Sequence, residues 1–448
     1  MPVLVRTLPG PQCKSAGPVN RGRRPFYEIE ILWGSCHHCQ MERPTSRSLF
    51  AILVMAVLLY VVGAWLHIPY GGGHVYSDIV TVFQIRECAG TCTLPVPYVQ
   101  GFVEYPVLTA FFMYAMGALG GHLPGDLLSN YYALTCIALL VPTLLLVREL
   151  YLLARMRGVS TGRVLWFYVA TPTFLIMILL NWYVIGTFFA VAGIRQFLLG
   201  RRKAAGALMG LSAASNLVTA APAVGLLLSE RRFKDALRLS GAAGAVYGAI
   251  NIPVFLLNPS NWVAFWTYQT NWYVEGSWME IFLNIFSPLR HTVSVSVFVI
   301  LFSLVLLVRF RLKERDPVRL GFLTLFAFVS STYVYTPQMN VMLLPFYVIL
   351  LIPSSYFEFL AFDLLNAGVI VVGFSQVLLP LGITYHVVQF GLDSPVQWMA
   401  IIRSLWLGKL FVYDGLGKPY VIAEEPRASI RTQHPALLSR LEPMRQVD

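Results

Sequence analysis

Charged residues are scarce in this chain. Asp, Glu, Lys and Arg make up 12% of its 448 residues, whereas hydrophobic residues make up 57% and the mean hydropathy is +0.65. Soluble globular domains carry about 25% charged residues, so this deficit excludes an ordinary soluble protein. Segments of about ten residues with alternating polarity are also missing, which excludes a transmembrane β-barrel. The composition therefore predicts an all-α membrane protein.

Cysteines and clustered metal ligands are scarce as well. Cys36 and Cys39 have the two-residue spacing of a metal knuckle, but no second ligand pair accompanies them. The segments placed outside the membrane below hold no cluster of acids at ligand spacing, so we expect no metal and no cofactor. Cys88 and Cys92 lie on the outer side, where a disulfide persists if it forms. Their close spacing alone leaves that bond open.

Long apolar runs are abundant from Leu49 onward. A spanning helix needs about 20 mostly apolar residues, and repeated runs of this kind are stable in lipid only as helices. We predict a bundle of about 10–12 transmembrane helices within 49–412, of which the last, near 397–411, is interrupted by Arg403 and Lys409. The clearest runs are 49–66, 129–147, 164–180, 182–199, 240–257, 291–308, 320–336 and 357–379.

Basic residues are concentrated in short loops. The net charge is +11, yet the stretch 68–128 contains one arginine and the stretch 258–290 contains one. By the positive-inside rule, the N-terminus and the basic loops are cytoplasmic, and 68–128 is the first outer loop of a multi-pass cell-membrane protein. This distribution explains the positive charge without a nucleic-acid partner. The basic clusters are Arg43 and Arg47; Arg155, Arg157 and Arg163; Arg201, Arg202 and Lys203; Arg231, Arg232 and Lys234; and Arg309, Arg311, Lys313 and Arg315.

The two ends of the chain differ from the apolar middle. Residues 1–48 are rich in Pro, Gly and Arg and predict a disordered, basic cytoplasmic arm. They do not resemble a signal peptide, because the basic region is too long and no small-residue cleavage site follows the apolar run. Residues 413–448 are polar and predict a cytoplasmic tail.

The stretch 204–229 has basic clusters at both ends, which places both ends on the cytoplasmic side. A single span cannot satisfy that arrangement. Asn216 and Pro222 lie in the middle, in "SNLVTAAP", and proline interrupts a helix. We therefore predict two short helices that meet near the outer face, where the freed backbone groups need polar surroundings.

The first outer loop is amphipathic rather than uniformly polar. We predict that "YSDIVTVFQIREC" and "EYPVLTAFFMYAMGAL" form helices in the membrane interface. This loop carries the polar residues from which a site is most easily built: Tyr76, Asp78, Arg86, Glu87, Glu104 and Tyr105.

The outer loop 258–290 holds four tryptophans, with Glu275 and Glu280 among them. Such aromatic residues form an interfacial belt in many membrane proteins. They also suit a platform for a sugar or a lipid, because their flat apolar rings have polar edges. Arg290 and His291 follow, and a cation at an outer boundary is unusual under the charge rule. We expect Arg290 to contact a phosphate, although both residues also fit a simple helix start.

Several short motifs follow one another between residues 49 and 350, and their order is informative. They are "SDI" in the first outer loop, then "EYPVL", "NW", "GRRKAAGALMGLSAASNLVTAAP" and "YTPQMNVMLLP". In this order they resemble glycosyltransferase family 87, membrane enzymes of the GT-C fold that include polyprenol-phosphate-mannose-dependent mannosyltransferases. The resemblance implies a GT-C-type bundle that transfers a sugar from a polyprenyl or dolichyl phosphate to a lipid or glycan acceptor on the extracytoplasmic face.

The resemblance assigns roles to particular residues. The acid of the first outer loop is the family's catalytic base and falls on Asp78. The family's "YPP" resembles Tyr105 and Pro106, with Val107 in place of the second proline, and its "PQ" resembles Pro337 and Gln338. Relatives carry a lysine at the position of Asn216, so a donor phosphate here would depend on Arg86 or Arg290, or the activity differs. The candidate binding residues are Tyr76, Arg86, Glu104, Tyr105, Asn216, Arg290, His291 and Gln338.

An inverting transfer fits this outer surface. Nucleotide sugars are made in the cytoplasm, so an activated sugar reaches the outside on a lipid, and one carboxylate then deprotonates the acceptor hydroxyl. The residues also allow local explanations. Ser77 or Asp78 caps the following helix, Glu104 is a first-turn acid, and Arg86 pairs with Glu87 or extends to the interface.

Two other classes remain open. The broken stretch 204–229 also fits a lipid or solute transporter. A non-catalytic member of the same fold is the third alternative, and the missing lysine at position 216 favours it.

Overall fold

The computed structural model describes residues 46–87, 94–350, 356–387, 391–410 and 412. These residues form helices and loops with no β-strand, and the only bridges among them are isolated, Pro97 to Gly101 and Glu275 to Val334. The predicted all-α class is therefore confirmed for this part. The metal-knuckle cysteines, Cys88 and Cys92, and the predicted tail lie outside the described residues, as does the predicted arm up to residue 45.

Within the described residues, five helices are long and apolar enough to cross a membrane. Four of them contain a predicted apolar run in full, and α1 starts three residues before its run, whereas α15 ends at Gly373, within the predicted run 357–379. The five are α1 (Ser46–Leu66), α4 (Leu127–Met156), α10 (Phe233–Leu257), α12 (Arg290–Phe310) and α15 (Tyr356–Gly373).

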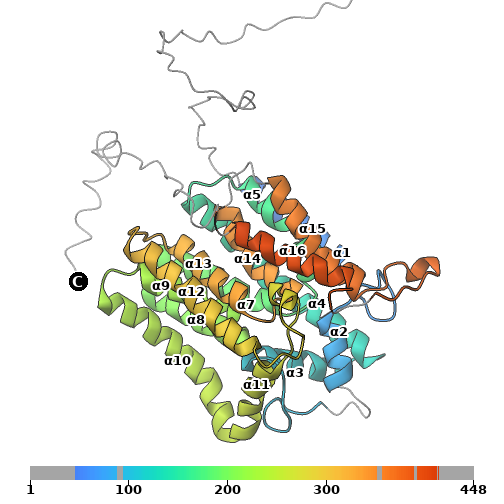
Figure 1. Ribbon diagram of the computed structural model, residues 1–448. Coiled ribbons are helices and arrows are strands. Elements are labelled where there is room, and N and C mark those ends of the chain that lie inside the picture. The colour runs from blue at the N-terminus through green and yellow to red at the C-terminus, as the bar shows by residue number, and fades with distance from the viewer. Residues whose placement is uncertain (1–45, 88–93, 351–355, 388–390, 411, 413–448) are drawn as a thin grey trace, which may run out of the picture. The chain divides into compact units, whose positions relative to one another are not determined.

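Shorter helices pack against these five and against one another (Figure 1). The run that Arg403 and Lys409 interrupt also forms one helix, α16, which lies beside α15. The shorter helices are α3 (Val107–Gly121), α7 (Tyr183–Leu198), α8 (Arg202–Ser215), α9 (Pro222–Ser229), α11 (Pro259–Asn271), α13 (Pro317–Ser331), α14 (Asn340–Leu350) and α16 (Pro395–Leu410).

One predicted span is broken. The run 164–180 was expected to form a single helix, but it contains α5 (Gly162–Val164), η2 (Leu165–Val169) and α6 (Pro172–Met177). Thr171 starts α6 by accepting a hydrogen bond from Phe174 N at 3.1 Å, and Pro172 follows at the first helical position. Hydropathy does not reveal this break, because its cause is a cap and a proline inside an apolar segment.

The predicted break in 204–229 is confirmed. Helix α8 ends before Asn216, a 3-10 turn covers Val218–Ala220, and α9 begins at Pro222. The Asn216 side chain accepts a hydrogen bond from Val218 N at 3.0 Å, and Thr219 donates to the Asn216 carbonyl at 2.7 Å. Side-chain groups thus replace the backbone bonds that the break removes.

Helices α8 and α10 run side by side in the same direction (Figure 1). Gly206 faces Leu239 and Ala242, and Gly210, one turn later, faces Ala243. A Cβ atom at Gly206 would lie 2.1 Å from the Leu239 carbonyl oxygen, so only glycine permits this close approach.

The stretch 68–128, predicted to be the first outer loop, contains helices in the two segments where they were predicted, and their place in the membrane interface stays a prediction. They are α2 (Asp78–Val82), continued by the π-turn η1 (Phe83–Glu87), and α3. Helix α3 packs on α4, where a Cβ atom at Gly120 would lie 3.1 Å from Tyr131 N. This packing places the loop's polar residues beside the start of α7 and the break after α8.

Candidate active site

A cavity of about 560 Å³ opens among the first outer loop, the start of α7, the α8–α9 break, helix α11 and the segment that precedes α14. Segments more than 100 residues apart in sequence meet in its wall. Six of the nine candidate site residues line it: Tyr76, Asp78, Glu104, Tyr105, Asn216 and Gln338.

Two amide side chains bind the Asp78 carboxylate. Asn181 Nδ2 donates to Asp78 Oδ2 at 2.9 Å, and Gln338 Nε2 donates to the same oxygen at 3.3 Å. The carboxylate is half-buried and lines the cavity. Asn181 lies just before α7, and Gln338 lies in the 3-10 turn Pro337–Met339. Asn181 belongs to the "NW" motif, but sequence reasoning did not include it among the site residues.

The backbone around Asp78 is held from several sides. The Ser77 hydroxyl donates to the Leu179 carbonyl at 2.9 Å, and Ile79 N donates to the Leu180 carbonyl at 3.3 Å. Ser77 makes no side-chain capping bond to α2, so its capping interpretation is wrong. These contacts fix the first turn of α2 against the end of the broken span and direct Asp78 to the cavity.

Desolvation raises the pKa of Asp78 to about 6. Hydrogen bonds from Asn181 and Tyr76 favour the charged form and lower the pKa, whereas the charge of Glu104 raises it. At neutral pH the carboxylate is therefore mostly ionised, and it is a stronger base than an exposed aspartate. A base with a pKa near the working pH is the kind that proton transfer favours.

Tyr105 forms the wall next to Asp78. Its ring packs edge-on against Trp182 at 4.7 Å between centroids, and its hydroxyl accepts a hydrogen bond from Asn181 Nδ2 at 3.4 Å. Burial raises the pKa of Tyr105 well above its usual value, so the hydroxyl stays protonated. Gln269 of α11 donates to the Glu104 carbonyl at 2.7 Å and ties this wall to the aromatic loop.

Another part of the cavity wall is aromatic and carries an acid that was not among the candidates. Glu275 lines the cavity, and Trp272 Nε1 donates to its Oε2 at 2.7 Å. Trp272 stacks on Tyr273 at 4.9 Å and packs against Tyr268 at 5.1 Å. The four tryptophans of 258–290 suggested an aromatic platform from the sequence, but no local pattern distinguished Glu275 from Glu280 as a lining residue.

Arg290 and His291 do not line the cavity. The Arg290 guanidinium lies 5.7 Å from the Tyr333 ring, and the His291 ring packs edge-on against the same ring at 5.2 Å. Tyr333 itself lines the cavity, so both residues lie one ring behind its wall. Arg86 lies in the π-turn η1, which ends at Glu87, but its side chain falls outside the described part of the structure.

The described lining residues include three carboxylates, from Asp78, Glu104 and Glu275, and no Lys, Arg or His. Within the described ranges no three His, Cys, Asp or Glu side chains are grouped to hold a metal ion. The donors that face the cavity are therefore amides, hydroxyls and indole N–H groups.

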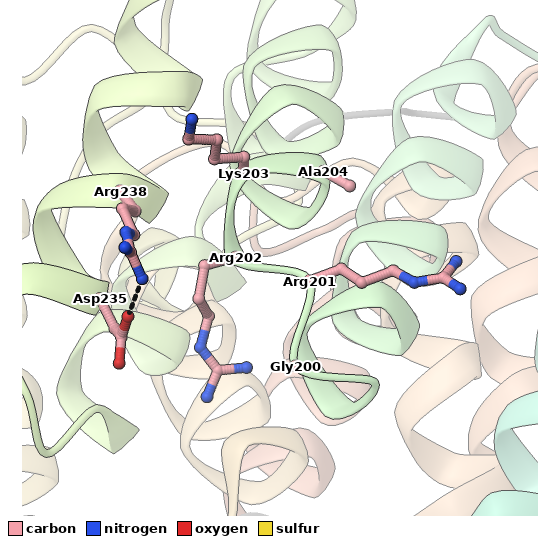
Figure 2. Close-up of a pocket in the computed structure, with 7 residues that line it drawn as sticks. All are labelled: Gly200, Arg201, Arg202, Lys203, Ala204, Asp235 and Arg238. Atoms are coloured by element: carbon pink, nitrogen blue, oxygen red, sulfur yellow. Dashed lines mark hydrogen bonds and ion pairs between the residues drawn. The ribbon is translucent and has the colours of Figure 1, made fainter. Parts of the chain in front are cut away.

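A second, basic cavity of about 390 Å³ lies where α8 and α10 begin (Figure 2). Arg238 pairs with Asp235 at 3.0 Å, and Arg202 pairs with Glu230 and lies over the Phe197 ring. Figure 2 shows Arg201 extending away from Arg238. Because these arginines are paired or point away from one another, their side chains do not converge on one point where a ligand could bind.

No protein-family model matches the chain, and a comparison with curated proteins finds no match.

Proposed function

We propose that this protein is a membrane glycosyltransferase of the GT-C type that moves a sugar, mannose by resemblance, from a polyprenyl or dolichyl phosphate to a lipid or glycan acceptor on the extracytoplasmic face. The observation that carries the proposal is the Asp78 carboxylate, which the amides of Asn181 and Gln338 bind at the wall of a 560 Å³ cavity. The five long apolar helices supply the membrane setting that a lipid-linked donor requires.

Asp78 is the general base of this proposal. It accepts the proton of the acceptor hydroxyl while that oxygen attacks the anomeric carbon, and the bond to the lipid phosphate breaks on the opposite face with inversion. Two amide donors keep the carboxylate oriented for this step. Its pKa of about 6 matches a base that works near neutral pH.

The departing phosphate needs donors, and Asn216 does not supply a charge. Amides and protonated hydroxyls such as that of Tyr105 stabilise an anion by hydrogen bonds rather than by an ion pair. Arg290 lies one ring away, behind Tyr333. Because Arg290 does not line the cavity, its contact with a phosphate stays a prediction.

The aromatic wall suits the sugar. Trp266, Trp272 and Tyr273 line the cavity. Flat aromatic rings with polar edges pack against the faces of sugars, and carboxylates accept hydrogen bonds from sugar hydroxyls. This arrangement provides a place for a pyranose beside the base.

Transfer of radiolabelled mannose from a polyprenyl phosphate donor, in membranes that contain the full chain, tests the proposal. We expect transfer by the wild type and its loss in Asp78→Asn. Asp393→Asn is the matched control, because Asp393 is exposed and lies outside the cavity wall. Equal transfer by Asp78→Asn and the wild type would refute the assignment of the base.

A transporter is the second candidate, and one observation favours it. The break between α8 and α9 places Asn216 in the cavity wall, and broken helices line the binding sites of many transporters. Uptake of a labelled lipid or solute into vesicles without sugar transfer would favour this class over the enzyme. Binding of the donor with neither transfer nor uptake would favour a non-catalytic member of the fold.

A further inference from the structure

Glu275 is held in the cavity wall by its own backbone. Its N–H donates to the Tyr333 carbonyl at 2.9 Å, and its carbonyl accepts from Tyr335 N at 2.8 Å. These two bonds form the isolated bridge between Glu275 and Val334. The bridge joins the aromatic loop to the segment that leads, three residues after Tyr335, to Gln338.

The residue after Glu275 must be glycine. Gly276 has a φ of +62°, in the left-handed region, and a Cβ atom there would lie 2.7 Å from the Tyr335 carbonyl oxygen. The chain therefore turns sharply behind Glu275 while the Glu275 side chain lines the cavity.

Arg403 of α16 is buried behind this turn. It is 0% exposed, and its Nη2 donates to the Gly276 carbonyl at 2.8 Å and to the Tyr335 carbonyl. Its guanidinium lies 3.9 Å from the centroid of the Tyr335 ring. One guanidinium thus binds both sides of the bridge that carries Glu275. In the sequence, Arg403 interrupts an apolar run; in the structure, its side chain binds the backbone on both sides of the bridge.

Asn366 extends this contact to the base. Arg403 Nη1 donates to Asn366 Oδ1 at 2.9 Å, and Asn366 Nδ2 donates to the Pro337 carbonyl at 3.0 Å. Pro337 directly precedes Gln338, the residue that binds Asp78. The polar network behind the cavity therefore reaches both Glu275 and the amide that orients Asp78.

We propose that Glu275 is a second ligand-binding carboxylate of this cavity, which accepts hydrogen bonds from the hydroxyls of the transferred sugar, and that Arg403 is the positioning residue that holds Glu275 and Gln338 in place. The sugar as the ligand rests on the proposed function. The pKa of Glu275 is raised to about 7, mainly by burial; the hydrogen bond from Trp272 and the charge of Arg403 act to lower the pKa, and the charge of Asp78 acts to raise it.

Geometry favours a binding role over a structural one. The hydrogen bonds of Arg403 go to two backbone carbonyls and to Asn366, so the guanidinium supports the backbone behind Glu275. The Glu275 carboxylate instead lies beside stacked aromatic rings in the cavity wall. An acid between flat rings is an arrangement that binds sugar hydroxyls.

The test uses the purified full chain in detergent, with mannosylphosphoryl-polyprenol as the probe and polyprenyl phosphate without the sugar as its reference. Glu275→Gln is compared with Glu280→Gln, because Glu280 belongs to the same loop and is buried but does not line the cavity. We measure the rise in melting temperature that each probe causes, together with KM and kcat for transfer.

We expect Glu275→Gln to lose the extra stabilisation that the sugar-bearing probe gives and to raise its KM at least about tenfold, with a much smaller change in kcat. Glu280→Gln should respond like the wild type. Similar responses of the two variants, or a wild type that both probes stabilise equally, would overturn the role of Glu275.

Arg403 is tested with Arg403→Met and Arg403→Lys, and Lys409→Met on the same helix is the control because Lys409 lies in an exposed pair with Glu358. We expect the Met variant to raise KM, to lower kcat through Gln338, and to shift the pH profile of kcat. Should the Met variant not fold, the Lys variant, which keeps the charge without the forked donors, carries the test. A Lys variant with wild-type KM, kcat and pH profile would refute the positioning role.

The proposed function and the role of Glu275 can be refuted separately. A wild type that binds the sugar-bearing probe without transferring the sugar would refute the proposed function and leave the Glu275 comparison valid. A wild type that transfers the sugar while Glu275→Gln and Glu280→Gln behave alike would refute the inference alone.

Discussion

The two cavities lie at opposite ends of helix α8 and differ in charge and in how that charge is held. The basic cavity begins at Gly200, and the acidic cavity includes Asn216, directly after the helix. A helix of this length spans about 20 Å. In the basic cavity, arginines pair with Glu230 and Asp235, whereas in the acidic cavity amides and an indole bind the carboxylates.

The two cavities therefore differ in whether their charged side chains are neutralised by ion pairs or bound only by neutral donors. An ion pair places a full opposite charge beside a carboxylate, whereas the neutral donors of the acidic cavity orient the carboxylates and offset only part of their desolvation. The raised pKa values of Asp78 and Glu275 are the result. We therefore expect variants in the acidic cavity to affect activity and variants in the basic cavity to have little effect.

The largest expected effect is at Asp78. Asp78→Asn keeps the shape of the side chain and removes the base, so we expect the kcat for sugar transfer to fall by about 10²–10⁴-fold. Initial rates at saturating donor, in membranes with matched protein amounts, measure it. A fall of less than about tenfold would show that another group takes the proton.

A pH dependence of stability should follow from Glu275. The pKa of Glu275 is about 7 in the folded chain, whereas its ordinary value is 4.5. The folded state therefore holds the proton up to a higher pH than the unfolded state, and the stability of the fold falls as pH rises from about 4.5 to 7. Gln does not titrate. Glu275→Gln should therefore gain stability relative to the wild type as pH rises from about 4.5 to 7, by up to about 3 kcal/mol.

Melting temperatures of both chains between pH 4.5 and 8 measure this gain. The charged or titratable groups that act on Glu275 from neighbouring segments are Asp78, Glu280, Tyr273 and Arg403. Because Asp78 and Glu280 also titrate, each pH series is repeated in the Asp78→Asn and Glu280→Gln backgrounds. A constant difference between Glu275→Gln and the wild type in all backgrounds would contradict the raised pKa.

Helix α8, which connects the two cavities, packs closely on α10, and one added methyl group at this contact should lower the stability of the chain. Gly206→Ala places a Cβ atom against the Leu239 carbonyl and should destabilise the chain by about 1–3 kcal/mol. Gly241→Ala in α10 is the control, because nothing lies within 4 Å of a Cβ atom there, and it should be neutral or slightly stabilising. Thermal unfolding in detergent distinguishes the two, and equal melting temperatures would refute the close contact.

The smallest effect is expected in the basic cavity. Arg201→Gln removes a charge that extends away from Arg238 and should change both stability and transfer by less than about 0.5 kcal/mol (Figure 2). A large loss of transfer in this variant would show that the basic cavity also belongs to the functional site.

The sequence alone determined the features that depend on neighbouring residues. Apolar runs of about 20 residues gave the long helices, and Asn216 and Pro222 gave the break, because hydropathy and backbone restrictions act locally. The acid at position 78 and the aromatic loop were also visible without a structure. The run 164–180 shows the limit, since its break depends on the Thr171 cap within an apolar segment.

Only the tertiary structure decided which polar groups meet. Asn181 lies 103 residues from Asp78 and Gln338 lies 260 residues from it, and no local pattern reports such pairings. The same holds for Arg403, which the sequence presents as a defect in a span and the fold buries against Gly276 and Tyr335, and for Arg290, which lies behind Tyr333. Local sequence fixes the helices, whereas the close packing of distant helices fixes the site.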